Sequence, residues 1–295
     1  MNGKSGGKIN IIGFGPGSFD HLTRRGREAI IESATIIGYN TYVDIIEGLL
    51  TGQDVIRTGM TEEVSRAQKA VELAKEGLTV GVISSGDAGV YGMAGLVYEV
   101  LIQEGWREGD NPAVEVVPGI SAINSCAALL GSPIMHDACI ISLSDHLTPW
   151  EIILRRVKAA AEADFVIALY NPRSGRRTRQ IVETQRILLE HRNPETPVGL
   201  VKSAYREGDQ EVVRTTLEKM LDFPIGMLTT VIIGNSSTFY HGDLMITPRG
   251  YQRKYDLTAS TQALRPGERL HRENEPWSLE ATRQLAEEAL KKVRP

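Results

Sequence analysis

The chain has 295 residues, of which 41% are hydrophobic, so it can bury a large core, and we expect two domains of ordinary size. Its formal net charge of −4 argues against a general nucleic-acid-binding protein, which usually carries a basic excess. The two cysteines, Cys126 and Cys139, lack CxxC spacing and a nearby histidine at metal-ligand spacing, so we expect neither a disulfide framework nor a metal site.

The first half of the chain alternates between strand-like and helix-like segments. Eight polar residues lead into the short apolar run 9–13, which is too short for a signal sequence or a membrane span, so we expect a cytoplasmic protein without a membrane partner. Strands are expected at 9–13, 35–38, 78–84 and 114–117, and helices at 22–33, 62–76 and 90–104. This alternation predicts an α/β domain over residues 8–118, with a boundary between Pro118 and Gly119.

A second α/β series is expected over residues 119–246. Helices are predicted at 120–130, 150–161 and 178–191, and strands at 138–143, 165–170, 198–202, 211–214 and 229–234. The last two strands, which follow the alternating series, suggest antiparallel partners in this domain.

The tail 247–295 is charged and contains prolines, so it belongs to neither domain core. A late amphipathic helix is predicted at 279–293. The tail could be an arm packed on a partner subunit or a linker toward a further domain.

The first glycine-rich loop, GFGPG at residues 13–17, directly follows a predicted strand. A dinucleotide-binding fingerprint would need GxGxxG and, about twenty residues later, an acidic residue at the end of the second strand. Here Gly17 comes too early, and the second strand ends in Gly38, Tyr39 and Asn40 without a carboxylate. The loop is therefore either a tight strand-to-helix turn or a cradle for another ligand.

A second glycine-rich loop, SSGDAGVYGMAG at residues 84–95, also follows a predicted strand. In α/β sheets the ligand crevice lies beyond the carboxyl ends of the strands, where both loops are expected to fall. Asp87 could accept a hydrogen bond from a ligand, or it could cap the helix expected to begin near Val90.

These two loops, together with VVPGISA and LYNPRSGRR, occur in the order and spacing of the tetrapyrrole methylase family, which the chain resembles over residues 8–246. This family comprises the S-adenosylmethionine-dependent enzymes of cobalamin and sirohaem synthesis. The resemblance implies a two-domain α/β fold unlike the Rossmann-type methyltransferases (class III), with the cofactor in the interdomain cleft and usually a homodimer. GDAGVYGMA and LYNPRS are similar to the motifs of the members that methylate carbon 17 of precorrin-3B or cobalt-factor III with ring contraction.

The resemblance also implies which residues contact S-adenosylmethionine, or S-adenosylhomocysteine after the transfer. They are Pro16, Gly86, Asp87, Ala88, Val90, Tyr91, Ser121, Ala122, Tyr170, Asn171 and Ala204. Many relatives have Gly-Asp-Pro where this chain has Gly86, Asp87 and Ala88, which implies a less rigid loop.

Ring contraction moves protons and therefore needs general acid–base groups. Asp145 and His146 lie just past the C-terminal end of the strand expected at 138–143, and we take them as the catalytic candidates. In the alternative interpretation Ser144 or Asp145 caps the next helix and His146 is a solvated loop residue. His136 and Asp137 precede the strand and are weaker candidates.

An anionic tetrapyrrole partner would explain a cluster of arginines. The segment NPRSGRRTRQ contains Arg173, Arg176, Arg177 and Arg179. Cations at the start of a helix oppose the helix dipole unless an anion lies nearby, and guanidinium groups suit paired carboxylates. We expect Arg173, Arg176 and Arg177 to bind substrate carboxylates, with Lys202 or Arg206 as possible extensions; a solvated charged face is the alternative.

Other functions remain open at this point. The chain could methylate another corrin position, such as carbon 11 or 20, because the cofactor loops are shared within the family. It could also be a nucleotide-dependent enzyme, but neither glycine loop has the lysine of GxxxxGK[ST]. A non-catalytic sensor of a small ligand would not need Asp145 and His146.

Overall fold

The computed structural model describes residues 6–251 and 257 of the chain. The strands and helices in this part all lie within one compact unit, which ends at Thr247. The helix expected at 279–293 lies outside the described residues. Below, the first half denotes residues 6–118 and the second half residues 119–247; the division into two domains at this point stays a prediction.

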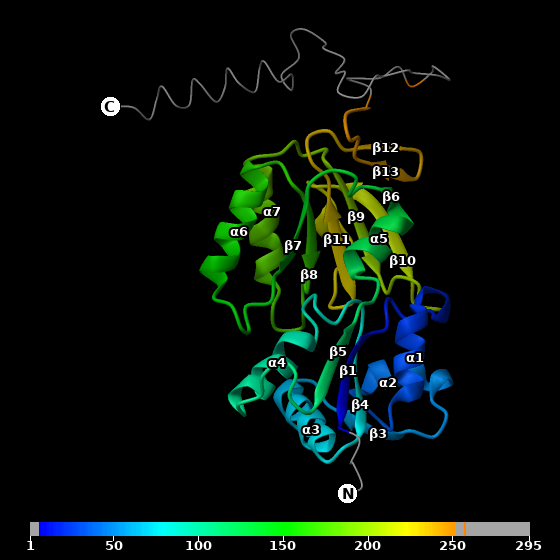
Figure 1. Ribbon diagram of the computed structural model, residues 1–295. Coiled ribbons are helices and arrows are strands. Elements are labelled where there is room, and N and C mark those ends of the chain that lie inside the picture. Colours follow the sequence, from blue (N-terminus) through cyan, green and yellow to red (C-terminus); the bar gives the residue numbers. More distant parts are fainter. Residues whose placement is uncertain (1–5, 252–256, 258–295) are drawn as a thin grey trace, which may run out of the picture. The chain divides into compact units, whose positions relative to one another are not determined.

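A parallel sheet that contains β1, β4 and β5 forms the centre of the first half (Figure 1). It has five strands in the order β3-β2-β4-β1-β5. Its strands are β1 (Lys8–Gly13), β2 (Thr35–Tyr39), β3 (Asp54–Thr58), β4 (Thr79–Ser84) and β5 (Ala113–Val117). Because all five are parallel, their carboxyl ends meet at one edge of the sheet. Both glycine-rich loops therefore emerge at the same edge, as predicted.

Helices cover both faces of this sheet. They are α1 (Arg24–Glu32), α2 (Asn40–Ile46), α3 (Glu63–Lys75) and α4 (Ala94–Gln103), with short 3₁₀ helices η1 (Phe19–His21) and η2 (Glu47–Leu49). In β1, Ile9 and Ile11 pack with α3 and α4, whereas Ile12 packs with α1 and α2. This alternation along a fully buried strand explains its unbroken apolar sequence.

A mixed five-stranded sheet forms the centre of the second half, in the order β10-β9-β11-β8-β7. Its strands are β7 (Ala138–Ser142), β8 (Val166–Tyr170), β9 (Pro197–Lys202), β10 (Glu211–Thr216) and β11 (Thr229–Ile233). The β7–β8 pair is parallel, while β8–β11, β11–β9 and β9–β10 are antiparallel. The predicted antiparallel partners are thus confirmed.

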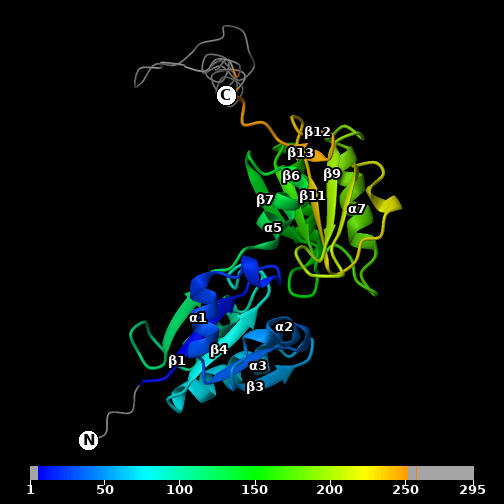
Figure 2. The same ribbon diagram turned by 90° about the vertical axis from the view of Figure 1, so that its right-hand side faces the viewer.

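The helices of the second half are α5 (Ala122–Leu130), α6 (Trp150–Glu162) and α7 (Arg179–Leu189), and η3 (Met220–Asp222) is a 3₁₀ turn. A separate small sheet contains β6 (Gly131–Ser132), β12 (Phe239–His241) and β13 (Leu244–Ile246). Figure 2 shows β12 and β13 together beside β6. Within the described residues, no helix is long and apolar enough to cross a membrane.

Three local features of the first half differ from the sequence-based expectation, and in the second half the small sheet of β6, β12 and β13 was not predicted. Helix α4 begins at Ala94 rather than near Val90, because residues 86–93 form an irregular turn in which Tyr91 has a φ of 53°. Strand β3 and helix α2 were not predicted. Strand β3 lies at the edge of its sheet and leaves alternate residues exposed, so its sequence lacks an apolar run.

An ion cluster connects the edge strand β5 to β1 and α1. Glu115 accepts from Lys8 Nζ at 2.6 Å and from Arg25 Nε at 2.7 Å, and Arg25 also pairs with Glu32 at 2.8 Å. The hydrogen bond from Arg25, assisted by Lys8, lowers the pKa of Glu115 to about 2. Because this pKa lies below the ordinary value of 4.5, the ionised carboxylate stabilises the folded state above pH 4.5.

We therefore expect the free energy of unfolding to fall as the pH is lowered from about 4.5 to about 2, where Glu115 becomes protonated in the folded state as well. Glu115→Gln should make this part of the pH profile shallower, as measured by urea denaturation. Glu190→Gln is the control, because Glu190 forms an exposed ion pair with Arg186 on α7. An unchanged slope in Glu115→Gln would contradict the assignment.

Candidate functional site

The backbones of three loops lie in close contact at the carboxyl edge of the first sheet, because glycines occupy the points of contact. Gly15 and Gly86 exchange two backbone hydrogen bonds, at 3.0 and 2.8 Å. A Cβ at Gly119 would lie 2.2 Å from the carbonyl oxygen of Gly86 and 2.4 Å from that of Gly13. Since real Cβ atoms do not approach backbone oxygens so closely, this contact requires glycine. We call the contact among Gly13, Gly86 and Gly119 the three-glycine contact.

Asp87 fastens the second glycine loop to the third loop. Its Oδ1 accepts from the backbone N–H of Gly89 at 2.8 Å, and its Oδ2 accepts from that of Gly119 at 3.0 Å. The alternative role as a helix cap is wrong, because α4 starts at Ala94 and its N-cap is Met93, with no side-chain cap. Both carboxylate oxygens instead maintain the arrangement of the loops.

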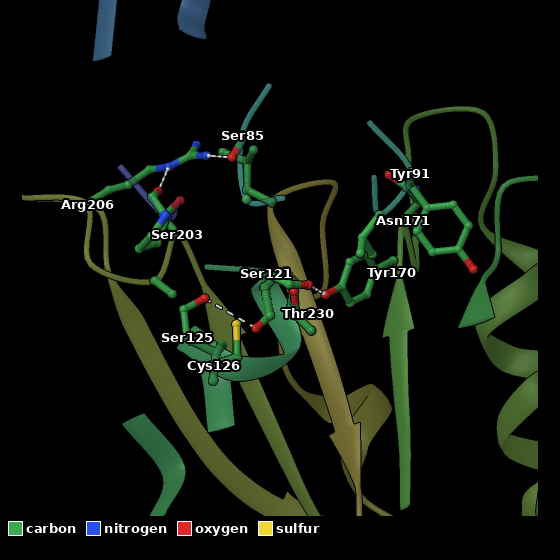
Figure 3. A pocket seen from close by; sticks show the side chains of 18 of the residues that line it. Ser85, Tyr91, Ser121, Ser125, Cys126, Tyr170, Asn171, Ser203, Arg206 and Thr230 are labelled. Atoms are coloured by element: carbon green, nitrogen blue, oxygen red, sulfur yellow. Dashed lines mark hydrogen bonds between the residues drawn. The ribbon is translucent and has the colours of Figure 1, made fainter. Parts of the chain in front are cut away.

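A pocket lies beside these loops and is lined from both halves of the chain (Figure 3). The pocket is open to solvent, and together with its open mouth it spans about 890 Å³. Residues of the first half in its wall are Pro16, Tyr42, Ser85, Gly86, Asp87, Val90 and Tyr91. Those of the second half are Ser121, Ala122, Ser125, Cys126, Tyr170, Asn171, Val201, Ser203, Ala204, Arg206, Met227, Leu228, Thr229 and Thr230.

The residues expected to contact S-adenosylmethionine all line this pocket except Ala88. Ala88 has no exposed surface and packs in the core under α3 and α4, so its side chain lies behind the wall. Its carbonyl oxygen accepts from the N–H of Ala94, which fixes the start of α4. The structure therefore brings together motifs that are far apart in the sequence, while the contacts with the cofactor stay a prediction.

Tyr170, at the end of β8, orients the first turn of α5. Its Oη accepts from the backbone N–H of Ile123 at 2.6 Å. The same hydroxyl hydrogen-bonds Ser121 Oγ at 2.8 Å (Figure 3). The hydroxyl thus partners one of the N–H groups that a helix start leaves free. Burial raises the pKa of Tyr170, so the phenol stays protonated at neutral pH and can keep both contacts.

Tyr91 reaches from the second glycine loop to strand β7 of the other half. Its Oη accepts from the backbone N–H of Ser142 at 3.1 Å and donates to the carbonyl oxygen of Ile140 at 3.4 Å. Its ring lies 5.7 Å from that of Tyr170. Ser142 Oγ in turn accepts from Asn171 Nδ2 at 3.1 Å, so two residues of the pocket wall meet at Ser142.

Comparison with known proteins identifies the family. The profile of the Tetrapyrrole (Corrin/Porphyrin) Methylases matches residues 8–221. The chain belongs to this family. A crystal structure of the methyltransferase CobJ has a TM-score of 0.75 at 34% identity, over 82% of this chain and all of that one. The resemblance predicted from the motifs and the two-domain α/β fold of tetrapyrrole methylases are thus confirmed.

Two curated relatives are more similar in sequence. A cobalt-factor III methyltransferase of Priestia megaterium is 69% identical over 95% of this chain, which spans only 52% of that protein. A probable cobalt-factor III C(17)-methyltransferase of Salmonella typhimurium is 45% identical over 82% of this chain and 99% of its own length. The chain therefore spans about half the length of the Priestia relative but nearly all of the Salmonella one.

A third comparison concerns the donor. A uroporphyrin-III C-methyltransferase of Thermus thermophilus, solved in complex with S-adenosylhomocysteine, shares the fold with a TM-score of 0.60 at 20% identity. The match covers 77% of this chain and 97% of that one. Enzymes of the tetrapyrrole methylase family use S-adenosylmethionine as the methyl donor.

The arginines expected to bind the substrate of this tetrapyrrole methylase lie just before α7, outside the pocket wall. Arg177 donates from Nη2 to the carbonyl oxygen of Asn171 at 2.9 Å and from Nη1 to Ser144 Oγ at 3.4 Å. Arg173 and Arg176 are exposed. Arg177 therefore connects two loops of the protein, and its role toward the substrate, like that of Arg173 and Arg176, stays a prediction.

The catalytic candidates Asp145 and His146 lie in the exposed loop between β7 and α6, outside the pocket wall. Asp145 Oδ2 accepts from Gln180 Nε2 on α7 at 2.8 Å. The loop follows Ser142 and so emerges beside Tyr91. Their part in catalysis stays a prediction.

Several wall residues were not predicted from the sequence. Arg206 was expected to extend the arginine cluster, but it lies in the pocket wall and donates to Pro16 and Ser85. Lys202 was expected to extend the same cluster, but its ammonium group forms ion pairs with the carboxylates of Asp209 and Glu211. Ser125 and Cys126 come from α5, and burial raises the pKa of Cys126 to about 11, so its thiol stays protonated. The only feature of the sequence that could have placed Arg206 in the pocket wall was its position shortly after a predicted strand.

Asp87→Ala should loosen the glycine loops, because it leaves the N–H groups of Gly89 and Gly119 without their acceptor. We expect a loss of about 1–3 kcal/mol in the free energy of unfolding and a weaker affinity for S-adenosylhomocysteine, measured by urea denaturation and calorimetry. Asp110→Ala is the matched control, because Asp110 accepts from the backbone N–H of Arg107 in a loop outside the pocket wall. It should reduce stability but not affinity. Equal affinity in both variants would show that Asp87 does not shape the pocket.

Proposed function

We propose that the chain transfers a methyl group from S-adenosylmethionine to carbon 17 of cobalt-factor III and contracts the macrocycle during cobalamin biosynthesis. The observation that carries the proposal is the single pocket in which the glycine loops of the first half meet the PGISA and LYNP motifs of the second half. The names of the Priestia and Salmonella relatives support the substrate and the position of methylation.

The residues of the pocket wall suit this donor. Hydroxyl groups of Ser121, Ser125 and Thr230 can hydrogen-bond a ribose or an amino-acid group, while apolar side chains such as Val90 and Leu228 can contact an adenine ring. Bound there, S-adenosylmethionine would supply an activated methyl group on a positively charged sulfur.

Methyl transfer itself demands little acid–base chemistry from the wall. The macrocycle carbon provides the electron pair of the new bond, and the electrons of the broken bond remain on sulfur, so the protein has to align the two partners and exclude water. Asp87 has both carboxylate oxygens engaged by backbone N–H groups, and Tyr170 is protonated and engaged as well. The wall is therefore built for binding and orientation rather than for proton transfer.

Ring contraction moves protons, and we assign this task to Asp145 and His146 in the loop after β7. Histidine is the side chain that most often acts as a general acid or base in enzymes. Arg173, Arg176 and Arg177 would bind acetate and propionate groups of the substrate from the neighbouring loop. As in the family resemblance, we propose that the enzyme acts as a homodimer.

The proposal is tested by incubating the protein anaerobically with S-adenosylmethionine and either cobalt-factor III or metal-free precorrin-3B. We expect the cobalt form to gain one methyl group, located at carbon 17 by NMR with a ¹³C-labelled donor, and its absorbance to change as the ring contracts. Methylation at another carbon, or of neither compound, would overturn the proposal.

The same assay separates the two chemical steps. His146→Ala and Asp145→Asn should still transfer the methyl group but accumulate a product that is not contracted. If both variants release the contracted product at the wild-type rate, the acid–base groups lie elsewhere.

A further inference from the structure

The turn at residues 203–208, which follows β9, has an unusual and well-braced backbone. Ser203 and Tyr205 have φ values of 49° and 57°, in the left-handed region that non-glycine residues rarely adopt. Hydrogen bonds from Ser203 Oγ to Asp209 Oδ2 at 2.6 Å and from Tyr205 N to Gln210 Oε1 at 2.7 Å hold this shape. Strained backbone that the surroundings maintain is typical of functional sites.

The braced turn aims Arg206 at both glycine loops of the first half. Arg206 Nε donates to the carbonyl oxygen of Pro16 at 3.0 Å, and Nη2 donates to Ser85 Oγ at 3.1 Å (Figure 3). Arg206 also packs on the first loop, since a Cβ at Gly17 would lie 3.1 Å from its Cγ. The guanidinium therefore connects the same two loops that Gly15 and Gly86 connect through their backbones, at the residues next to these glycines.

The neighbouring residue Tyr205 adds a second contact with the first loop. Its ring lies 4.0 Å from that of His21, and the two planes are inclined by 31°. His21 is itself held by Ser18, whose Oγ lies 3.0 Å from His21 Nδ1. The turn thus touches the first half at Pro16, His21 and Ser85.

We propose that Arg206 is a positioning residue of the methyl-donor site, which holds the two glycine loops in their binding arrangement and thereby sets the affinity for the donor. The identity of the ligand rests on the function proposed above. A planar guanidinium can donate to two separate acceptors at once, whereas a lysine ammonium acts as a single point charge. Loops that are already ordered before the ligand binds lose less conformational entropy on binding, so the complex is tighter.

A double-mutant cycle tests whether Arg206 acts through Ser85. The affinity for S-adenosylhomocysteine is measured by calorimetry for the wild type, Arg206→Gln, Ser85→Ala and the double variant. We expect Arg206→Gln to weaken binding roughly tenfold, since it removes two charge-assisted hydrogen bonds. The double variant should bind as Arg206→Gln does, because the contact with Ser85 is already absent. If the loss of affinity in the double variant equals the product of the two single losses, Arg206 and Ser85 act independently and the proposed coupling is wrong.

Two further variants serve as controls. Arg206→Lys retains the positive charge but not the planar guanidinium, so we expect its affinity to lie between those of Arg206→Gln and the wild type. Wild-type affinity in Arg206→Lys would show that charge alone suffices and would contradict the role with two acceptors. Arg186→Gln removes an exposed arginine that pairs with Glu190 on α7, and it should bind like the wild type.

Amide hydrogen exchange without ligand separates this inference from the proposed function. Arg206→Gln should accelerate exchange in peptides that cover residues 14–19 and 84–90, whereas Arg186→Gln should not. Unchanged exchange in both peptides would overturn the positioning role, whatever the ligand is. Faster exchange in a protein whose wild type does not bind S-adenosylhomocysteine would refute the proposed donor and leave the role of Arg206 intact. If Arg206→Gln does not fold, Ser85→Ala is used for the same exchange measurement.

Discussion

The pocket depends on the close approach of three backbones at Gly13, Gly86 and Gly119. A side chain at Gly119 would have to displace the carbonyl oxygens of both other loops, and a Cβ at Gly13 would lie 2.8 Å from the backbone nitrogen of Gly119. Gly86 is needed for a different reason, because its φ of 68° lies in the left-handed region. Asp87 stabilises the three-glycine contact by accepting a hydrogen bond from the backbone N–H of Gly119. Parallel strands β1, β4 and β5 deliver these loops to one edge of the sheet, and the pocket wall of the first half follows from that placement.

Hydrogen bonds continue from this wall into the loops of the second half. Tyr91 contacts Ser142, Ser142 contacts Asn171, and Asn171 accepts from Arg177 through its carbonyl oxygen. Arg177 also reaches Ser144, next to the loop that carries the catalytic candidates. The pocket proposed for the donor and the segments expected to meet the macrocycle are therefore parts of one polar network, which suits a reaction that depends on the alignment of two substrates.

The sequence predicted the features that depend on local patterns. Glycine loops after apolar strands indicated the edge of the sheet at which the pocket lies, and ten of the eleven residues that the motifs predicted line its wall. The eleventh, Ala88, has its side chain buried by the irregular turn. Arg206 and residues 227–230 could not be predicted in the same way. They meet because β9 and β11 pair antiparallel with Lys202 opposite Thr229, and such a non-local register leaves no periodic signal in either segment. Strand β3 was not predicted, because it lies partly exposed at the edge of the sheet, and only a strand that is buried on both faces has a continuous apolar sequence.

Calorimetric titration of Gly119→Ala with S-adenosylhomocysteine tests the three-glycine contact most directly. Gly95→Ala is the matched control, because a Cβ at this helical position meets nothing within 4 Å. We predict that Gly119→Ala loses affinity by roughly tenfold or more, since the added Cβ separates the loops that form the pocket, and that Gly95→Ala binds like the wild type. Wild-type affinity in Gly119→Ala would contradict the claim that close backbone packing shapes the donor site.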